Sequence, residues 1–372
     1  AYELSEKETI NMQAKLKKSI ISFILLLIIL ISPLQIYAEG ELDLVYFNDI
    51  FDIVQENYLE EMSSDQHIEN SIDGLFDGLD NYSDYYNQEE FSDLNEQLEG
   101  NFVGIGAYIK EENGYIKIVS PIKGSPAEKA GLLPDDIILK INGKTAEEAT
   151  NLIKGDKGTR VRLRVKRNNI SKTISIIRDK VVLNPLDYRL IDDIGYISFK
   201  QFNDSSYESM LEALEFMDKN DISKLILDLR DNPGGYLDQA IYISNLFVPE
   251  GPVVHIQYRD KDTESYDSFL DEVKYELVVL VNNNSASASE ILAGAIKDTK
   301  AGILVGVTTF GKGTVQEVIS LPKGDGIKLT IAEYFSPKMN KIDGLGIRPD
   351  IIVDNHKGLD TQLKTAIDLL TN

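Results

Sequence analysis

Residues 281–316 read VNNNSASASEILAGAIKDTKAGILVGVTTFGKGTVQ, and this stretch decides how the second half of the chain is built. The apolar run at residues 277–281 predicts a short buried strand, which three asparagines then break. Serines follow at every second position and lead into a helical pattern of apolar residues. A strand, a polar turn and a helix start place a hydroxyl at a helix N-terminus, where free backbone N–H groups favour developing negative charge. The stretch therefore suits a nucleophilic serine.

Three serines are candidates for this role: Ser285, Ser287 and Ser289. Helical spacing puts the first and the third on one face and Ser287 elsewhere, which does not choose among them. Ser287 and Glu290 also fit the spacing of a capping box, in which a serine only starts a helix. Both interpretations of the serines stay open at this point.

A nucleophilic serine needs a base, and histidine is the usual one. No local pattern ties the three histidines to the serines; they are His67, His255 and His356. Lysine also serves when burial lowers its pKa and leaves a neutral amine. Lys312 is the candidate, because it lies between two glycines directly after a strand predicted at residues 303–307. The alternative is a lysine in an exposed turn.

Two further features of the lysine segment matter. If the segment is extended, Lys312, Thr314 and Gln316 share one face, although full extension separates the outer two by about 13 Å and a bend would be needed. Residues 306–312 also match most of a glycine-rich phosphate-binding loop. Gly313 stands where that loop needs Ser or Thr, and a β-like segment follows where a helix should begin, so we exclude nucleotide binding.

A second turn of interest has the sequence DLRDNPGG at residues 228–235, at the end of a predicted strand. Pro233, Gly234 and Gly235 form a turn whose N–H groups can point at one spot, as an oxyanion hole requires. A strand-to-helix turn without a chemical role is the alternative.

Three motifs in this order, DLRDNPGG, SASASE and GKGTVQ, resemble those of the C-terminal processing proteases, or tail-specific proteases. These are Ser/Lys serine peptidases, and the resemblance covers nearly all of the chain after about residue 41. It implies that Ser287 is the nucleophile, Lys312 the general base and Gln316 a residue that orients the lysine. It also implies an oxyanion hole made of backbone N–H groups from Ala288 and from Gly234 or Gly235.

The composition narrows the function further. The chain has 372 residues, enough for two or three domains, and its net charge of −23 argues against nucleic acid, whose phosphates it would repel. It has no cysteine, which excludes disulfides, a cysteine nucleophile and a thiolate metal site. The histidines show no metal-ligand spacing. We expect neither a metal nor another cofactor.

The N-terminal residues have the pattern of an export signal. Lys15, Lys17 and Lys18 precede an apolar stretch at residues 20–31, and Ala38 is a small residue suited to cleavage. Residues 20–38 could instead remain as a membrane anchor, since a span needs about 20 residues. We expect residues 1–40 to hold an N-terminal extension with a signal peptide or anchor. The body would then be extracytoplasmic, either secreted or anchored to the cell membrane.

Residues 41–100 carry apolar residues at helical spacing and predict two or three amphipathic helices. Packing against a neighbouring domain explains these faces, and the resemblance adds a homodimer contact as the alternative. Residues 80–86 read DNYSDYY where the family has a proline-containing turn, so this loop is expected to differ.

Residues 101–178 show short strands and turns, with a hairpin predicted around Glu112, Asn113 and Gly114. Residues 124–143 resemble a PDZ domain in circularly permuted order, with a short helix after Ser125 and a buried strand at residues 137–141. Such a domain binds a peptide as an added strand and captures its terminal carboxylate with backbone N–H groups. The residues that match this loop are Gly104, Ile105 and Gly106, and their alternative role is to shape a hairpin.

Residues 179–372 alternate strands and helices, which implies βαβ units with functional loops beyond the strand C-termini. Strands are predicted at residues 194–199, 225–229, 253–258, 277–281, 303–307, 327–335 and 342–347, and helices at 205–219, 236–247 and 361–370. The resemblance implies a ClpP- or crotonase-like core. Tyr334, Phe335 and Pro337 would line a cleft or pack in that core.

Together these features predict a multidomain protein of mixed α/β and α+β class, with an N-terminal helical segment, a PDZ-like β domain and an α/β catalytic core. The predicted function is a serine endopeptidase that recognises protein C-terminal tails through its PDZ domain and cleaves them through an acyl-enzyme. The alternative is a non-catalytic scaffold whose PDZ domain only holds tails. The expected partners are protein substrates, with the membrane added if the N-terminal segment stays uncleaved.

Overall fold

The computed structural model describes residues 42–371 except 113–114, 146–151 and 357. The basic flank, apolar stretch and cleavage site predicted near the N-terminus lie outside the described residues. Within residues 42–371 and apart from those gaps, no helix is long and apolar enough to cross a membrane. The chain divides into two compact units, residues 1–72 and residues 73–372.

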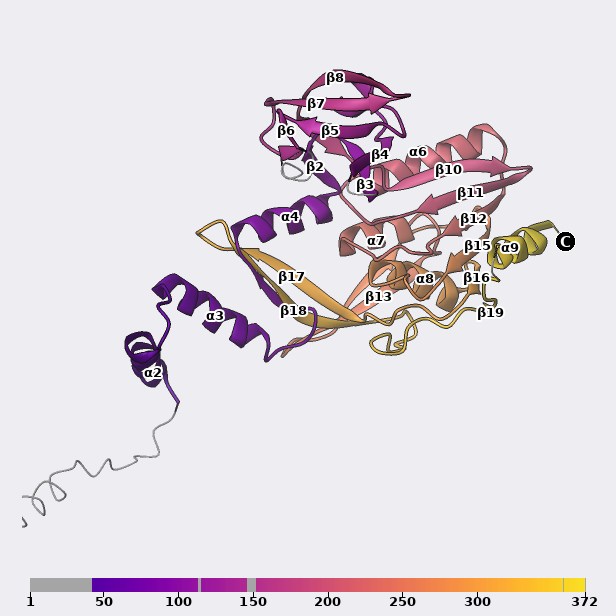
Figure 1. Ribbon diagram of the computed structural model, residues 1–372. Coiled ribbons are helices and arrows are strands. Elements are labelled where there is room, and N and C mark those ends of the chain that lie inside the picture. Colours follow the sequence, from indigo (N-terminus) through magenta and orange to yellow (C-terminus); the bar gives the residue numbers. More distant parts are fainter. Residues whose placement is uncertain (1–41, 113–114, 146–151, 357, 372) are drawn as a thin grey trace, which may run out of the picture. The chain divides into compact units, whose positions relative to one another are not determined.

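Three helices occupy the region predicted to be helical: α2 (Leu44–Asn57), α3 (Ser64–Phe76) and α4 (Gln88–Glu99) (Figure 1). Asp43 caps α2 by accepting a hydrogen bond from the N–H of Tyr46 at 2.8 Å. A capping box starts α4, because Asn87 and Glu90 each accept a hydrogen bond from the other's backbone N–H. The prediction of two or three helices is confirmed. The DNYSDYY sequence ends in a strand, β1 (Asp84–Tyr86).

Residues 101–178 contain a six-stranded antiparallel sheet in the order β3-β4-β5-β7-β8, with β6 beside β5. The strands are β3 (Ala107–Glu112), β4 (Tyr115–Pro121), β5 (Ile137–Ile141), β6 (Lys144–Thr145), β7 (Arg160–Arg167) and β8 (Ile170–Ile177). The predicted hairpin is formed by β3 and β4, although two of its turn residues, Asn113 and Gly114, lie outside the described residues. The predicted short helix is α5 (Pro126–Lys129), capped by the Ser125 hydroxyl.

A two-stranded ribbon brackets this β domain in the sequence. It pairs β2 (Asn101–Gly104) with β9 (Asp179–Val182) in antiparallel register, with Gly104 opposite Asp179. The chain therefore enters and leaves the β domain at the same place.

The core of the last half is a second six-stranded sheet in the order β10-β11-β12-β15-β16-β19 (Figure 1). Its strands are β10 (Leu186–Ile191), β11 (Ile194–Phe199), β12 (Lys224–Asp228), β15 (Glu276–Val281), β16 (Ile303–Gly306) and β19 (Ile351–Ile352). Only β10 is antiparallel to its neighbour. The helices that follow these strands are α6 (Ser206–Lys219), α7 (Leu237–Ser244), α8 (Ala288–Thr299) and α9 (Thr361–Thr371). The predicted βαβ alternation is confirmed.

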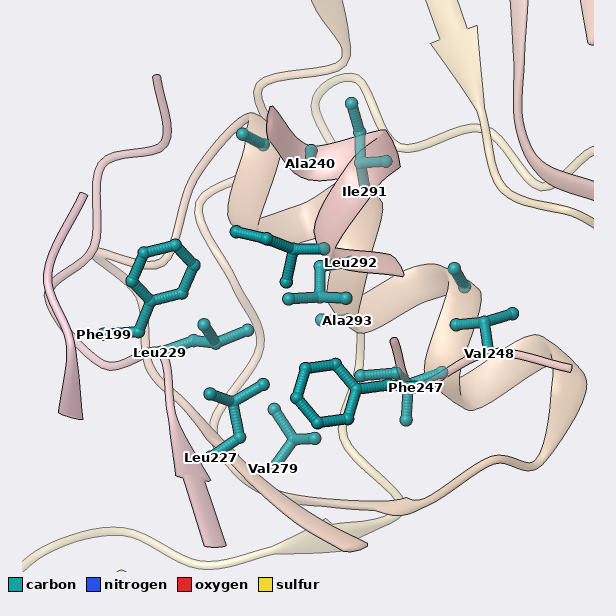
Figure 2. Close-up of a cluster of buried hydrophobic side chains, with 14 of the residues drawn as sticks. Phe199, Leu227, Leu229, Ala240, Phe247, Val248, Val279, Ile291, Leu292 and Ala293 are labelled. Atoms are coloured by element: carbon teal, nitrogen blue, oxygen red, sulfur yellow. The ribbon is translucent and has the colours of Figure 1, made fainter. Parts of the chain in front are cut away.

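Helices cover both faces of this sheet, and side chains that alternate along a strand pack against different helices. Leu227 and Val279 join a cluster with residues of α6, α7 and α8, whereas Ile226, next along β12, joins a cluster with α9. Figure 2 shows Leu227 and Val279 beside Phe247, with Leu292 of α8 over them. This packing fixes α8, whose N-terminus carries the serines.

A third sheet brings an early segment to the strand after Lys312. Its order is β1-β18-β13-β14, and β17 pairs with the opposite edge of β18. The added strands are β13 (Gly251–Tyr258), β14 (Glu264–Ser268), β17 (Thr314–Ser320) and β18 (Gly326–Phe335). In the β1 register, Asp84 lies opposite Lys328 and Tyr86 opposite Gly326. The DNYSDYY segment therefore belongs to the same sheet as the residues that follow Lys312.

One predicted strand is wrong. Residues 342–347 form a turn, in which Gly344 and Gly346 have φ angles of 71° and 69° that a strand does not allow. The apolar residues that suggested a strand, Ile342 and Ile347, are buried in the core. The N–H of Gly344 donates to the carbonyl oxygen of Gly311 at 2.8 Å, so the turn packs against the glycine before Lys312.

Candidate active site

Three loops meet beyond the carboxyl ends of β12, β15 and β16, where functional loops of an open α/β sheet are expected. The N–H of Ala286 donates to the carbonyl oxygen of Asn232, and the N–H of Phe310 to that of Ser285, both at 3.0 Å. The SASASE motif therefore contacts the DLRDNPGG motif on one side and the segment that leads into GKGTVQ on the other.

The three serines differ in their surroundings. Ser285 and Ser289 are fully buried, and their hydroxyls donate to the carbonyl oxygens of Leu229 at 2.8 Å and of Asn232 at 3.0 Å. Ser287 is half-buried, and its hydroxyl caps no backbone N–H of α8. Two of the hydroxyls therefore hold the loops together, and the third lies beside the Tyr334 hydroxyl.

Ser287 has a strained backbone. Its φ of 55° and ψ of −116° lie outside the regions that residues other than glycine favour. The N–H groups of Glu290 and Ile291 donate to the carbonyl oxygen of Ser287 at 2.7 and 3.0 Å, so the hydrogen bonds of α8 begin at this carbonyl. In the capping box that the spacing predicts, the Glu290 carboxylate accepts from the N–H of Ser287 at 2.9 Å.

The buried Glu290 carboxylate joins the serine loop to the lysine loop. Its Oε2 atom accepts from the N–H groups of Ser287 and Lys312, each at 2.9 Å, so the two backbone nitrogens lie at most twice that distance apart. Its Oε1 atom accepts from the N–H of Gly311 at 2.7 Å and from the hydroxyl of Thr309 at 2.5 Å. Burial raises the pKa of Glu290, and these four hydrogen bonds oppose the rise.

Lys312 is half-buried where the three loops meet. Burial lowers the pKa of its amine, and the charge of Lys328 lowers it further. The amine lies over the ring of Tyr82, 4.8 Å from the ring centroid. In the described part of the chain no hydrogen bond joins this amine to Ser287, but the backbones of the two residues are held together through Glu290. An amine withdrawn from water in this way has the property that a lysine base requires.

Gln316 lies in β17 and has hydroxyl partners. Its Nε2 atom donates to Thr314 Oγ1 at 2.8 Å and to Thr330 Oγ1 at 3.1 Å. A bulge between Val315 and Gln316 interrupts the strand, so the segment is not fully extended. Among the described residues, no hydrogen bond joins Gln316 to Lys312. Its role in orienting the lysine stays a prediction.

Gly234 and Gly235 bring the DLRDNPGG turn against the serine. A side chain on Gly234 would place its Cβ 2.8 Å from Ser287 Cβ and 2.9 Å from the Ala288 nitrogen, so only glycine permits this approach. The N–H of Gly234 donates to Asn232 Oδ1 at 2.9 Å, whereas the N–H groups of Gly235 and Ala288 donate to no described group. Of the predicted oxyanion donors, Gly234 is therefore occupied by Asn232, and Gly235 and Ala288 stay candidates.

Tyr334 belongs to the core and also touches the site. Its ring is fully buried, and its hydroxyl donates to the carbonyl oxygen of Lys312. Burial raises the pKa of Tyr334 well above its ordinary value, with the adjacent Ser287 hydroxyl opposing the rise. The phenol is therefore protonated at neutral pH and can hold the lysine turn in place.

The predicted peptide-binding loop connects β2 to β3. The carbonyl oxygen of Ile105 accepts from the N–H of Ala127 at 2.7 Å, and that of Gly106 from the Ser125 hydroxyl at 2.8 Å, so both carbonyls hold α5. The N–H groups of Ile105 and Gly106 donate to no described group. Gly104 pairs with β9 and precedes these two free amides.

Comparison with known proteins agrees with this arrangement. Residues 193–353 match the sequence profile of peptidase family S41, and residues 117–167 match that of a PDZ domain. A carboxy-terminal-processing protease of Bartonella bacilliformis is 38% identical over 339 residues, which cover 86% of this chain and 78% of the relative. A probable CtpA-like serine protease of Staphylococcus aureus is 36% identical over 319 residues, which cover 83% of this chain but only 64% of that longer protein.

Two solved structures share the fold. The photosystem II D1 C-terminal processing protease is 26% identical and has a TM-score of 0.53, with 88% of this chain and 91% of that chain covered. A putative S41 protease from Bacteroides fragilis has a TM-score of 0.55, with 89% of this chain and 98% of that chain covered. Its sequence identity is 14%, so this second likeness speaks for the fold alone.

Proposed function

Because the chain belongs to peptidase family S41, whose members are serine peptidases, we propose that Ser287 and Lys312 cleave the C-terminal tails of proteins held by its PDZ domain. The observation that carries this proposal is the Glu290 carboxylate. It holds the backbone of a strained serine next to the backbone of a half-buried lysine, whose pKa burial lowers. A serine that only capped a helix would require neither a strained backbone conformation nor a half-buried lysine beside it.

In the first step, the neutral amine of Lys312 accepts the proton of Ser287 Oγ while this oxygen attacks the scissile carbonyl carbon. Glu290 holds the two backbones close together, and rotation of the two side chains brings amine and hydroxyl into contact in this proposal. The lysine then gives the proton to the leaving amine as the carbon–nitrogen bond breaks. Water, deprotonated by Lys312, hydrolyses the ester left on Ser287 and restores both residues.

The negative charge of the tetrahedral intermediate falls on the substrate oxygen. The N–H groups of Gly235 and Ala288 donate to this oxygen, and the N-terminal end of α8 adds its dipole. One such donor is worth about 3 kcal/mol of the barrier. Gln316 orients Lys312 in this proposal, with Thr314 and Thr330 holding its amide.

The rest of the chain presents the substrate. Residues 41–100 form a helical region, residues 101–178 the PDZ domain and residues 179–372 the peptidase domain. A tail adds to the PDZ sheet as a strand, and the N–H groups of Ile105 and Gly106, next to Gly104, take its terminal carboxylate. The enzyme acts outside the cytoplasm, secreted or held at the membrane by its N-terminal segment. The apolar side chains exposed on α2 support a homodimer contact.

A folded protein with an unstructured apolar tail tests this proposal. After incubation with the enzyme, intact-mass spectrometry should show that the substrate has lost residues from its C-terminus. A matched substrate with an amidated C-terminus should be cleaved more slowly, because the PDZ loop captures a carboxylate. Tight binding of the intact tail without any cleavage would instead support the non-catalytic scaffold.

The pH dependence follows from the lysine. Only neutral Lys312 can accept the serine proton, and burial lowers the pKa of this amine. We expect kcat/KM to fall tenfold for each pH unit below that pKa and to level off above it, with the midpoint below the ordinary lysine value of about 10.4. Initial rates from pH 6 to pH 10 measure the profile. A rate that is constant across this range would contradict a lysine base.

A further inference from the structure

The segment at residues 80–86 lies far from Lys312 in the sequence and next to it in the fold. Its strand β1 pairs with β18, which also pairs with the strand that begins after Lys312. Ser83 is buried, and its hydroxyl accepts from the N–H of Thr330 in β18 at 3.0 Å. The segment is therefore fixed to the sheet just beside the lysine loop.

Tyr82 is the residue of this segment that touches the site. It is half-buried, and its ring lies over the Lys312 amine at 4.8 Å from the centroid. Asp80 fixes the turn that presents it, because Oδ1 accepts from the N–H of Tyr82 at 2.8 Å and Oδ2 from the Ser83 hydroxyl at 2.9 Å. The hydrogen bonds of Asp80 therefore fix the turn that places the ring over the amine.

Hydrogen bonds continue from this turn to the residue predicted to orient the lysine. Asp80 Oδ1 accepts from the Thr330 hydroxyl at 3.1 Å, and Thr330 Oγ1 accepts from Gln316 Nε2 at 3.1 Å. The turn at Asp80 therefore contacts the lysine through the Tyr82 ring, and it reaches Gln316 through Thr330.

We propose that Tyr82 is a positioning residue of the peptidase reaction, whose ring covers the Lys312 amine and keeps water away from it. The inference rests on the proposed function, in which this amine is the base. It makes the helical region before the PDZ domain part of the active site, because the cover comes from residues that precede that domain.

Two effects of the ring oppose each other. A ring face attracts an ammonium and so favours the protonated lysine, whereas withdrawal of the amine from water favours the neutral form and is the first cause of the lowered pKa of Lys312. The other charges near the amine are Lys328, which lowers its pKa, and Asp80 and Glu290, which raise it; Asp343 lies near the Tyr82 phenol. Loss of the ring admits water, so we expect the pKa of Lys312 to rise.

The experiment measures this pKa directly and also follows activity. Competitive acetylation with trace acetic anhydride from pH 6 to pH 11, read by peptide mass spectrometry, gives the midpoint for Lys312 without any need for turnover. Tyr82→Ala should raise the midpoint by about one unit and lower kcat/KM about tenfold at a pH below both midpoints. Tyr82→Asn, which also admits water and suits a turn, should do the same and serves if the alanine variant does not fold.

Two variants provide controls. Tyr82→Phe restores the ring, so it should bring back the midpoint of the parent. Tyr85→Phe removes the hydrogen bond from another tyrosine hydroxyl of the same segment to Asp325, keeps the Tyr82 ring, and should leave midpoint and kcat/KM unchanged. An unchanged or lower midpoint in folded Tyr82→Ala and Tyr82→Asn would overturn the inference. If the variants raise the midpoint but the parent protein cleaves no tail, the role of the Tyr82 ring in keeping water from Lys312 would be supported and the proposed function refuted.

Discussion

Ser287→Ala is expected to lower the cleavage rate of a tailed protein by roughly 10⁴- to 10⁶-fold, and Lys312→Ala by a similar factor, since residues that act as a unit are lost together. The serine variant lacks the attacking oxygen, and the lysine variant lacks the group that takes its proton. Apart from the contact between the Ser287 and Tyr334 hydroxyls, neither side chain joins separate parts of the described fold by a hydrogen bond, so circular dichroism melting should stay close to that of the parent. Full activity in either variant would refute the pair.

The neighbouring serines give matched controls for this result. Ser285→Ala and Ser289→Ala each remove a buried hydroxyl that donates to a carbonyl oxygen, at Leu229 and Asn232. Each should lower the free energy of unfolding by about 1 to 3 kcal/mol, because a buried acceptor loses its partner. Both variants should still cleave the substrate. A loss of activity in Ser285→Ala or Ser289→Ala as deep as that of Ser287→Ala would mean that the wrong serine has been chosen.

Glu290→Ala should have the second-largest effect, on stability and activity together. The change leaves four buried donors without their acceptor: the N–H groups of Ser287, Gly311 and Lys312 and the hydroxyl of Thr309. Each such group costs about 1 to 3 kcal/mol, so we expect a loss of at least about 3 kcal/mol of unfolding free energy even after water enters. Activity should fall about 10²-fold or more, because a shift of about 1 Å between catalytic groups has this effect. Urea denaturation and initial rates measure the two quantities.

Glu290→Gln tests whether the hydrogen bonds of this side chain or its negative charge matter more. A glutamine can turn its oxygen toward Ser287 and Lys312 and its amide toward Thr309, whose hydroxyl can accept as well as donate. Only the N–H of Gly311 then faces a donor. The glutamine variant should therefore keep more stability and activity than the alanine variant. If both variants matched the parent in stability and rate, the carboxylate would not hold the two loops together.

The sequence carried enough information for most of the elements. Strong periodicity placed α8 and the buried strands before and after it, and the order of strands and helices implied the parallel sheet that brings three loops together. The strand predicted at residues 342–347 is wrong because apolar residues alone do not reveal a turn: Gly344 and Gly346 are needed there at positive φ. The sequence also gave no sign that the N–H of Gly234, and not that of Gly235, would donate a hydrogen bond to Asn232.

The site was harder to predict from the sequence than the fold, for physical reasons. Three serines at every second position look alike until the backbone shows that two are buried and one is strained. Glu290 had the spacing of a helix cap, and its contact with the N–H of Lys312 crosses to another loop that only the folded sheet brings near. Tyr82 had no local signal beyond an unusual aromatic-rich turn, because its contact with Lys312 depends on the pairing of β1 with β18.

The central claim is that Ser287, activated by Lys312, forms the acyl-enzyme. It is tested most directly by acid quenching during turnover of a short peptide thioester, followed by trypsin digestion and fragmentation of the peptide at residues 275–297, which contains all three serines. The account predicts an acyl group on Ser287 alone, and none in Lys312→Ala. An acyl group on Ser285 or Ser289, or an equal yield without the lysine, would contradict it.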